Sequence, residues 1–527
     1  MNPSNPLKVP PRKSNNGIKY NRLRFPPTGG NADEHPATAL HRLKLVTSWF
    51  DSMAGGIVTM NELYNNRITS SMRGHDKQKF VLDEDLLNLV QNCSKDQGWP
   101  LLTYEYVRRA IADVFDQWLF LAHTVQEKQE KNGSGKSDDD ATSWIKQSSR
   151  SNVSKGPEED AVLRLQVPGA MAYVEELLRC TTGTSALAIP YEMTKVLAIK
   201  FMSGIENISM EVQKTQNSLM KMSRENYIKS ITDANLGMKF SEIEGTENTM
   251  VQIEWHTKTS ISQGRPPQVQ KIYKSHFNSM KQKYENIAAG VSGDDPNMAR
   301  FLSRMFVLLC RYDLIGDVKN RCQAVVPLTA SNAMTANFGI THECFSSPLN
   351  HRYSSFNSTL FSDIDACFGS LGSFFHFVPS EGSFSVNPPF GGDSLKIMFD
   401  HIFGVLRHSE NDKNALSFLV VIRGDNSILN HVKRSQFCRR ITTLENRYKY
   451  TMNTQHKDTV AASRMQSKDC GCASAVECTG AWSPSTSTSL LWLQNDFGHD
   501  TWCPSDTRVD QVLQGFHAHP ASNAIPV

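Results

Sequence analysis

The sequence predicts an α/β protein in which a mainly helical region precedes a domain built on a largely parallel sheet. Two observations support this fold class. Between residues 38 and 230, apolar residues recur at the spacing typical of amphipathic helices. From Asn337 onward, short apolar runs alternate with turn residues and helical patterns, as expected for strands that alternate with helices. A chain of 527 residues is long enough for two or three domains.

Composition and charge narrow the class of protein. Hydrophobic residues make up 39% of the chain and charged residues 21%, which is typical of a globular protein with some disordered segments. No apolar stretch is long enough to cross a membrane, and the first residues lack the apolar core of a secretion signal. The net charge is only +3, so a nucleic-acid surface has to be a local basic patch. The 11 cysteines are scattered, which is typical of reduced intracellular thiols.

Residues 1–36 are predicted to form a disordered basic arm. They are rich in Pro, Asn, Gly, Lys and Arg, and they show no apolar periodicity. Their basic pieces, 11–13 and 19–24, could contact phosphates or an import receptor, or could simply be solvated. We expect the protein in the nucleus, with the cytoplasm as the alternative.

Residues 37–295 are predicted to form the mainly helical domain. Its clearest helix lies within residues 101–131. Residues 131–158 form an insert in this domain that has the composition of a disordered linker. Residues 250–257 alternate in the manner of a strand. The apolar stripe of the clearest helix consists of Val107, Ala110, Ile111, Val114, Phe115, Trp118 and Leu119.

Residues 271–287 combine lysines with aromatic residues and are predicted to be helical. Cations beside aromatic rings suit phosphate contact and base stacking, which makes this segment a candidate RNA-binding surface. On a helix, Lys271, Lys274 and Lys281 share one face, and Lys283 lies to the side. Lys274 and Lys281 are the candidate RNA contacts, and the alternative is an amphipathic helix with a solvated lysine face.

Residues 296–512 are predicted to form the α/β domain. An apolar helix at 300–316 opens it, and residues 457–488 form an insert rich in Cys and Ser. Residues 513–527 are predicted to be a tail. The strand-like runs are ITHECFSSPLN, SFFHFV, GSFSVNPPF, ALSFLVVI and STSLLWLQND, and SLKIMFDHIFGVLRH has a helical pattern.

The tetrapeptide Asn387-Pro388-Pro389-Phe390 is the motif that carries chemistry. It follows a strand-like run and precedes a helical pattern, so it lies where open α/β sheets bind ligands. The side-chain oxygen of Asn387 and the carbonyl of Pro388 can accept both N–H bonds of an exocyclic adenine amine. This leaves the nitrogen lone pair directed at a methyl donor.

The remaining residues of the motif suit the same task. Two prolines stiffen the turn before the substrate arrives, and Phe390 offers a face for base stacking. An activated donor such as S-adenosylmethionine needs no metal, and none is expected. An Asn-Pro-Pro turn can also be purely structural.

Residues 338–510 resemble the catalytic domain of the cap-specific adenosine N6-methyltransferases (CAPAM), also called the phosphorylated CTD-interacting factor family. The matching pieces are FGITHECFSSPLN, DIDACFGSLGSFF, GSFSVNPPF, LSFLVVI, SQF and LLWLQND, in the order of that family. The resemblance implies a Rossmann-like class I methyltransferase domain that uses S-adenosylmethionine. It also implies methyl transfer to N6 of the (2′-O-methyl)adenosine beside the m7G cap of mRNA, so the expected partner is the capped 5′ end of an RNA.

The resemblance implies roles for particular residues. The tetrapeptide matches the catalytic motif, and residues 343–350 match the first cofactor-side motif. Two aspartates are candidates for the donor's ribose hydroxyls, and residues 368–370 for closing over its adenine, although a tight turn is the alternative. The candidate donor-binding residues are Glu343, Phe345, Ser347, Pro348, Asn350, Asp363, Asp365, Phe368, Gly369 and Ser370.

The sequence departs from the family beside the target-base pocket. Gly391 and Gly392 follow the tetrapeptide where the family has acidic residues, and Arg423-Gly424-Asp425-Asn426 replaces a Pro-Glu-Trp segment. Gly392 and Arg423 are nevertheless the candidate substrate contacts of these loops. The changes leave two alternatives open: a catalytically weak cap- or RNA-binding relative, and a methyltransferase for another adenine in RNA or DNA.

Tryptophan and cysteine spacing bear on two further kinds of module. No segment of about 30 residues shows the two-tryptophan pattern of a WW domain, so we expect no WW domain and no WW-mediated binding of the RNA polymerase II tail. Cys470, Cys472 and Cys478 with His456 lack the paired spacing of a zinc site and are expected to be loop residues.

Overall fold

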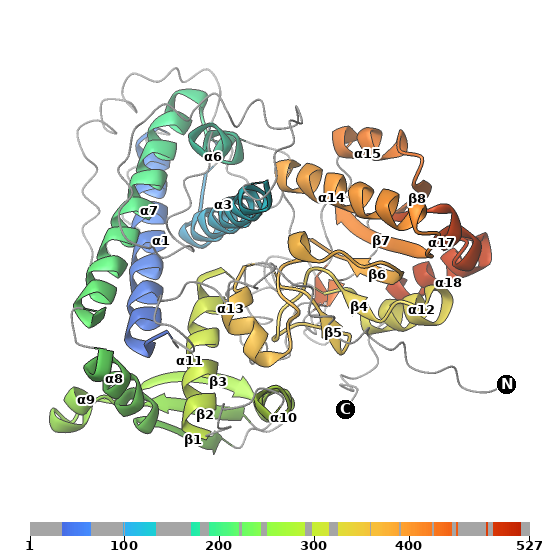
Figure 1. The fold of residues 1–527 in the computed structure, drawn as a ribbon. Coiled ribbons are helices and arrows are strands. Elements are labelled where there is room, and N and C mark those ends of the chain that lie inside the picture. Colours follow the sequence, from blue (N-terminus) through green and yellow to red (C-terminus); the bar gives the residue numbers. More distant parts are fainter. Residues whose placement is uncertain are drawn as a thin grey trace.

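The computed structural model describes residues 34–64, 99, 101–132, 170–179, 189–220, 224–243, 250–289, 298–315, 325–358, 360–388, 392–423, 426–444, 450–451, 481–482 and 488–517. Most of the predicted basic arm and of the two predicted inserts therefore lies outside the described residues. The last three residues of that arm are packed against the fold: His35 and Pro36 are buried, and Glu34 forms ion pairs with buried Arg42 and Arg311. Figure 1 shows a group of helices beside an α/β part.

Long helices form the N-terminal part. α1 packs against α3 and α7, and α3 also contacts α6 and α14. All seven residues of the predicted apolar stripe of α3 are buried, which confirms that helix and the face it buries. The helices are α1 (Pro36–Tyr64), α3 (Tyr104–Asn132), α6 (Ala170–Arg179), α7 (Tyr191–Met220) and α8 (Arg224–Leu236).

A three-stranded antiparallel sheet follows, with the order β1 (Met238–Ile243), β2 (Met250–Trp255), β3 (Gln268–Tyr273). A short helix, α9 (Lys258–Ser262), connects β2 to β3. The expected strand at 250–257 is confirmed as β2, but the region predicted to be mainly helical thus contains a sheet.

The helix predicted from residue 271 begins later. α10 spans Lys274–Ala289, and Lys271 lies on β3 instead. Gln270 and Ile272 are buried while Val269 and Lys271 are exposed, which is the alternation of a strand with one buried face. The prediction was wrong because this alternation is only a few residues long and runs directly into a helical pattern, so periodicity alone did not separate them.

α11 (Met298–Ile315) joins the two parts of the molecule. It contacts α1, α8 and β1 on one side and α13 (Ser362–Asp365) on the other. The apolar helix expected at 300–316 is confirmed as α11, and it packs on both parts of the molecule. One hydrophobic core extends from the N-terminal helices through α11 to one face of the main sheet.

The main sheet is mixed and mostly parallel. Its order is β5-β4-β6-β7-β11-β8; neighbouring strands are parallel from β5 to β7, and β11 is antiparallel to both β7 and β8. The predicted α/β class with a largely parallel sheet is confirmed. The strands are β4 (His342–Glu343), β5 (Ser355–Phe356), β6 (Gly382–Val386), β7 (Leu416–Arg423), β8 (Cys438–Leu444) and β11 (Thr488–Gln494).

Both faces of this sheet are covered. Phe418 and Val420 of β7 face the large core beneath α14, whereas Leu419 and Val421 face a second cluster formed with α12 and α18. α18 extends into the residues predicted to be a tail, because Phe516 continues its buried face. The helices are α12 (Leu328–Phe338), α14 (Gly392–Asn411), α15 (Asn426–Lys433), α17 (Asp496–Thr501) and α18 (Asp506–His517).

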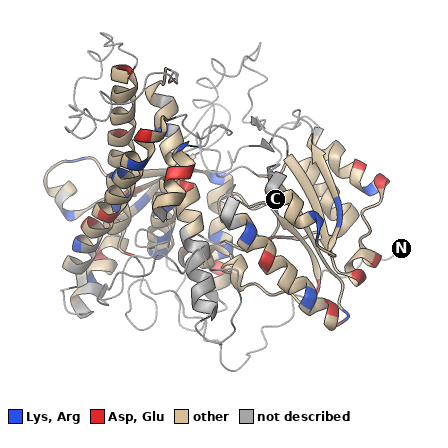
Figure 2. Ribbon diagram, turned by 90° about the horizontal axis from the view of Figure 1, so that it is seen from above, with Lys and Arg blue, Asp and Glu red and all other residues tan. Residues whose placement is uncertain are grey.

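Smaller elements complete the described fold. Residues SFFHFV, which resembled a strand, form the 3-10 turn η5 (Phe374–His376). A second such turn is η4 (Ala366–Phe368), and β9 (Tyr450–Thr451) pairs with β10 (Ala481–Trp482). Figure 2 shows basic and acidic residues interspersed over both parts, in agreement with the nearly balanced charge.

Candidate active site

The carboxyl ends of β4 and β6 define the candidate active site. The chain runs from β4 outward to β5 and then adds β6 on the other side of β4, so the strand order reverses between β4 and β6. Open α/β sheets bind ligands at such a reversal. Glu343 ends β4 and pairs with Ser385 of β6, and Asn387 follows two residues later. Glu343 and Asn387 therefore lie at the same edge of the sheet.

The structure confirms the local setting expected for the tetrapeptide. It follows β6 directly, and α14 begins at Gly392. Asn387 is half-buried and Pro388 is buried. Pro389 and Phe390 lie outside the described residues.

Glu343 is a buried carboxyl group at this edge, only 4% exposed. Its Oε2 accepts hydrogen bonds from the backbone N–H of Arg352 (2.6 Å) and the hydroxyl of Ser346 (3.4 Å). Burial raises the pKa of Glu343 to about 7, although the N–H and the charge of Arg352 act in the opposite direction. A cation beside Glu343 would favour its ionised form, so this position suits a cationic group of a ligand.

The β4–β5 loop (residues 344–354) is shaped by its own side chains. Oδ1 of Asn350 accepts hydrogen bonds from the backbone N–H of Ser347 (2.7 Å), the hydroxyl of Ser347 (2.8 Å) and the hydroxyl of Ser346 (3.0 Å). The carbonyl of Pro348 is 3.0 Å from Nε2 of His276 on α10. Asn350, Ser347 and Pro348 thus stabilise the turn and anchor it to α10.

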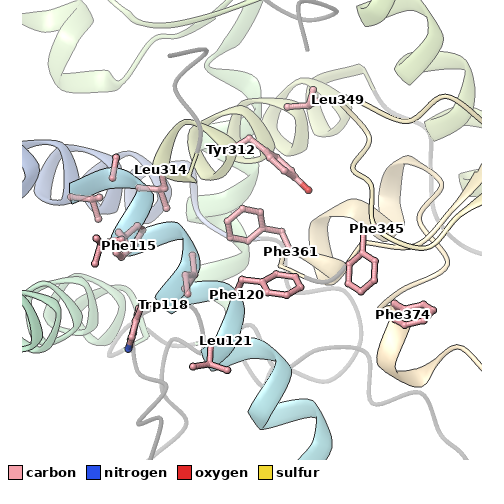
Figure 3. Close-up of a cluster of buried hydrophobic side chains, with 14 of the residues drawn as sticks. Phe115, Trp118, Phe120, Leu121, Tyr312, Leu314, Phe345, Leu349, Phe361 and Phe374 are labelled. Atoms are coloured by element: carbon pink, nitrogen blue, oxygen red, sulfur yellow. The ribbon is translucent and has the colours of Figure 1, made fainter. Parts of the chain in front are cut away.

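Phe345 anchors the same loop to the helical part. Its ring centroid lies 4.8 Å from that of Phe374 and 5.8 Å from that of Phe120 on α3. Figure 3 shows these rings with Phe361 and Tyr312 in one cluster. Phe345 therefore holds the loop against α3 in this structure.

Two predicted donor-binding residues face the core. The carboxylate of Asp365 is fully buried and accepts a hydrogen bond from the hydroxyl of Tyr312 (2.7 Å). Phe368 is also fully buried, with ring centroids of Tyr284 and Phe301 at 5.9 and 6.3 Å. A direct contact of either side chain with a donor would require it to leave this packing.

The turn at Gly369 and Ser370 borders β5. Gly369 has φ of 103°, a left-handed conformation that favours glycine. Ser370 forms a parallel bridge with Phe356, and its hydroxyl accepts a hydrogen bond from the backbone N–H of Ser358 (3.1 Å). The tight turn expected as an alternative is therefore present. Asp363 lies on α13, and its side chain is outside the described set.

The predicted substrate-side residues are spread over three elements. Gly392 begins α14, and Arg423 ends β7, the strand beside β6. Lys274 donates to Glu242 of β1 (2.6 Å), and Lys281 lies 3.7 Å from Glu285. Lys274 and Lys281 thus each have a carboxylate partner, and their predicted RNA contacts remain predictions.

Two histidines of this region, His342 and His351, were not singled out from the sequence, and Lys283 was placed only beside the basic face of its helix. His342 lies between Ser355 Oγ (2.7 Å) and Asn357 Oδ1 (2.6 Å) and stacks on Phe377. Burial lowers the pKa of His342 to about 4 and that of His351 to about 3. The adjacency of His342 to Glu343 was a usable signal, whereas nothing local linked Lys283 to residue 351.

No helix among the described residues is long and apolar enough to span a membrane. The same residues include no group of three or more His, Cys, Asp or Glu side chains suited to a metal ion. The cysteines at 470, 472 and 478 and His456 lie outside the described residues.

Comparison with known proteins gives two kinds of match. The family described as "Phosphorylated CTD interacting factor 1 WW domain" matches residues 267–454. A human protein named mRNA (2′-O-methyladenosine-N(6)-)-methyltransferase is 30% identical over 240 residues, which are 44% of this chain and 31% of the human protein. A mouse protein of the same name is 26% identical over 337 residues, 59% of this chain and 44% of the mouse protein. The chain thus spans less than half the length of these curated relatives.

The family match corrects two predictions. The expectation of a chain without the WW domain is contradicted by the match over residues 267–454, and so is the expectation that no binding to the RNA polymerase II tail takes place through it. Both rested on a search for paired tryptophans. The matched range contains no tryptophan, so that criterion had no means of detecting the match.

Proposed function

We propose that this protein is an S-adenosylmethionine-dependent adenine N6-methyltransferase that acts on the (2′-O-methyl)adenosine beside the m7G cap of mRNA. The observation that carries the proposal is the position of Asn387 at the carboxyl end of β6, next to Glu343 at the end of β4. The names and identities of the human and mouse relatives support the same activity. We assign the α/β part to the Rossmann-like class I methyltransferases, because its strand order reverses at this site.

Asn387 and Pro388 would orient the adenine amine. The side-chain oxygen of Asn387 and the carbonyl oxygen of Pro388 accept its two N–H groups, which aims the nitrogen lone pair at the donor's methyl group. Methyl transfer would form the bond from N6 to the methyl carbon and break the bond from that carbon to sulfur, and one N6 proton would pass to solvent water. The turn between β6 and α14 holds both acceptors before the base arrives, so little reorganisation is needed.

Glu343 would bind the donor's ammonium group. A buried carboxyl whose pKa is raised to about 7 gains from a cationic neighbour, and this fit is the structural reason to place the donor's amino acid end at β4. S-adenosylmethionine itself supplies a methyl group on a positively charged sulfur. Asn350 and Ser347 shape the loop around that end, and Phe345, Asp365 and Phe368 position its surroundings through packing.

The helical part and β1–β3 would supply the surface for the cap and the first nucleotides, with the nucleus as the site of action. α10 supports this role, because it follows β3 directly and contacts the β4–β5 loop through His276. Substrate contact by Gly392 and Arg423 is part of the same proposal, since Gly392 begins the helix that follows the tetrapeptide and Arg423 ends β7, the strand beside β6.

Methyl transfer from labelled donor to four short RNAs tests the proposal: m7G-capped or uncapped, and beginning with A or G. The expected result is transfer to the capped RNA that begins with A, and loss of transfer in Asn387→Ala. Equal transfer to capped and uncapped RNA would contradict cap dependence. Transfer to none of the RNAs, with donor binding intact, would favour a binding protein over an enzyme.

A further inference from the structure

Lys283 differs from the other lysines of α10. Its Nζ lies 2.7 Å from Nε2 of His351 and 5.6 Å from the centroid of the Phe356 ring. Lys274 and Lys281 each have a carboxylate partner, whereas Lys283 has none within ion-pair distance among the described residues. Lys283 is therefore a half-buried ammonium whose charge is not compensated.

His351 does not supply that compensation. Its Nδ1 lies 3.0 Å from the carbonyl of Tyr353, which places a proton on Nδ1 and leaves Nε2 as the acceptor for Lys283. The ring centroids of His351 and Phe356 lie 4.7 Å apart, and the imidazole is half-buried. Desolvation lowers the pKa of His351 to about 3, so the ring is neutral at physiological pH. The hydrogen bond from Lys283 to a neutral ring orients the ammonium and leaves its full charge.

The ammonium lies close to the edge of the sheet that carries the candidate active site. Phe356 is the last residue of β5, and a Cβ added at Gly369 would meet Cδ of Lys283 at 3.7 Å and Cε1 of Phe356 at 3.8 Å. β5 is two strands from β6 in the sheet, which corresponds to about 10 Å. A base held at the end of β6 would leave the phosphates of adjoining nucleotides within reach of Lys283.

We propose that Lys283 binds a backbone phosphate of the RNA substrate, next to the adenosine held at Asn387. The proposal rests on the proposed function. A half-buried cation without a carboxylate partner has already lost part of its hydration, so pairing with an anion stabilises it. An RNA strand offers a phosphate at each nucleotide. The sequence set Lys283 apart from the other lysines; the structure makes it the lysine best suited to this contact.

The test measures RNA affinity by fluorescence anisotropy with a short m7G-capped RNA at several salt concentrations. The variants are Lys283→Gln, which keeps a donor for His351, Lys283→Arg, which keeps the charge, and Lys281→Gln as the matched comparison on the same helix. In Lys283→Gln we expect the slope of log K against log salt to fall by about 0.7, the value for one lost phosphate contact on a single strand. Lys283→Arg should retain the slope, and Lys281→Gln should change it less.

A pH series adds a second readout. Burial lowers the pKa of Lys283 to about 8, so the ammonium loses its proton as pH rises through 8. The other titratable groups around it are His276, His351 and Arg352. RNA affinity of the unmodified protein should therefore fall between pH 7 and 9, and this fall should be absent in Lys283→Gln. The pH range lies below the ordinary pKa of lysine, so exposed lysines contribute little to it.

Donor binding by calorimetry separates the remaining outcomes. Unchanged donor affinity in Lys283→Gln supports the phosphate contact. Weaker donor binding with an unchanged salt slope would overturn it and assign the ammonium to the donor's carboxylate. Equal slope changes in the Lys281 and Lys283 variants would also overturn it. If the unmodified protein transfers no methyl group yet Lys283→Gln lowers the slope, the proposed function fails and the phosphate contact stands.

Discussion

The two strand ends that meet at the candidate active site are built differently. At the end of β4, buried Glu343 is followed by a loop whose shape depends on Asn350 and on contacts from α10. At the end of β6, half-buried Asn387 emerges from the strand into a proline turn. We infer from this comparison that the two ends have different roles. The β4 end binds the methyl donor and shapes the loop around it, and the β6 end orients the adenine amine. Variants at the two ends should therefore fail in different measurements.

The largest effect is expected at the β6 end. Asn387→Ala should lower the turnover number by about 10²–10³, because it removes one preorganised acceptor for the amine. Donor affinity, measured by calorimetry, should stay close to that of the unmodified protein. Asn387→Asp keeps an acceptor and should retain part of the activity. Near-normal turnover in Asn387→Ala would remove Asn387 from the mechanism and contradict the different roles of the two strand ends.

Acid should destabilise the β4 end. The pKa values of His276, His342 and His351 are lowered to about 4, 4 and 3 by burial, so the unfolded chain takes up protons first as pH falls below its unfolded value of about 6.5. Glu343 acts in the opposite sense, because its raised pKa lets the folded state bind one proton between about 7 and 4.5. The net uptake of about two protons by the unfolded chain should lower the free energy of unfolding by roughly 3 kcal/mol per pH unit between pH 6 and 5.

Urea unfolding at pH 7, 6 and 5 measures this dependence. His351→Gln should reduce the slope by about one proton, or about 1.4 kcal/mol per pH unit. An identical slope in the variant would mean that the pKa of His351 is not lowered in the folded protein.

Asn350 tests whether the loop at the β4 end depends on its own side chains. Asn350→Ala removes the acceptor of two buried donors of Ser347 and the shorter of the two hydrogen bonds of the Ser346 hydroxyl, whose other acceptor is Glu343. Each buried group left unsatisfied costs about 1–3 kcal/mol. Stability and donor affinity should both fall. Asn350→Asp retains an oxygen at the same place and should restore much of both. Urea unfolding curves measure the stability, and calorimetry measures the donor affinity. Intact donor binding in Asn350→Ala would show that the donor site does not depend on this turn.

The smallest expected effect is the pH dependence of donor binding at Glu343. Only the ionised carboxylate pairs with an ammonium, so donor affinity should fall about tenfold from pH 8 to pH 6 as Glu343 takes up a proton near pH 7. Glu343→Gln should bind the donor more weakly at pH 8 and show a flat profile. A parallel pH dependence in both proteins would assign the titration to another group.

Local patterns in the sequence were sufficient for the elements that carry the tetrapeptide. The run before Asn387 formed β6, the periodic segment after it formed α14, and the run at 416–422 formed β7. These elements were predictable because a buried strand and an amphipathic helix each show their burial in their own residues. The strand at 268–273 failed this criterion, because it is short and adjoins a helix.

The family-like motifs contain both residues that lie at the candidate site and residues whose side chains face the core. Glu343 and Asn387 lie together at the strand reversal, as the motifs implied. Asp365 and Phe368 belong to the same motifs, yet one is bonded to Tyr312 and the other is enclosed by Tyr284 and Phe301. The residue types of a motif do not show whether a side chain faces a ligand or the core, because the direction of the side chain is set by tertiary packing.

By itself, the sequence determined the α/β class, the strand that presents Asn387 and the chemistry that an Asn-Pro-Pro turn can perform. Only the tertiary structure decided which lysine of α10 lacks a carboxylate partner, since Glu242 reaches Lys274 across 32 residues and His351 reaches Lys283 across 68. It also decided that the carboxyl group of Glu343 is buried, which raises its pKa to about 7. The physical reason is that hydrogen bonding along the backbone and apolar periodicity act locally, whereas charge compensation and desolvation depend on groups brought together from distant parts of the chain.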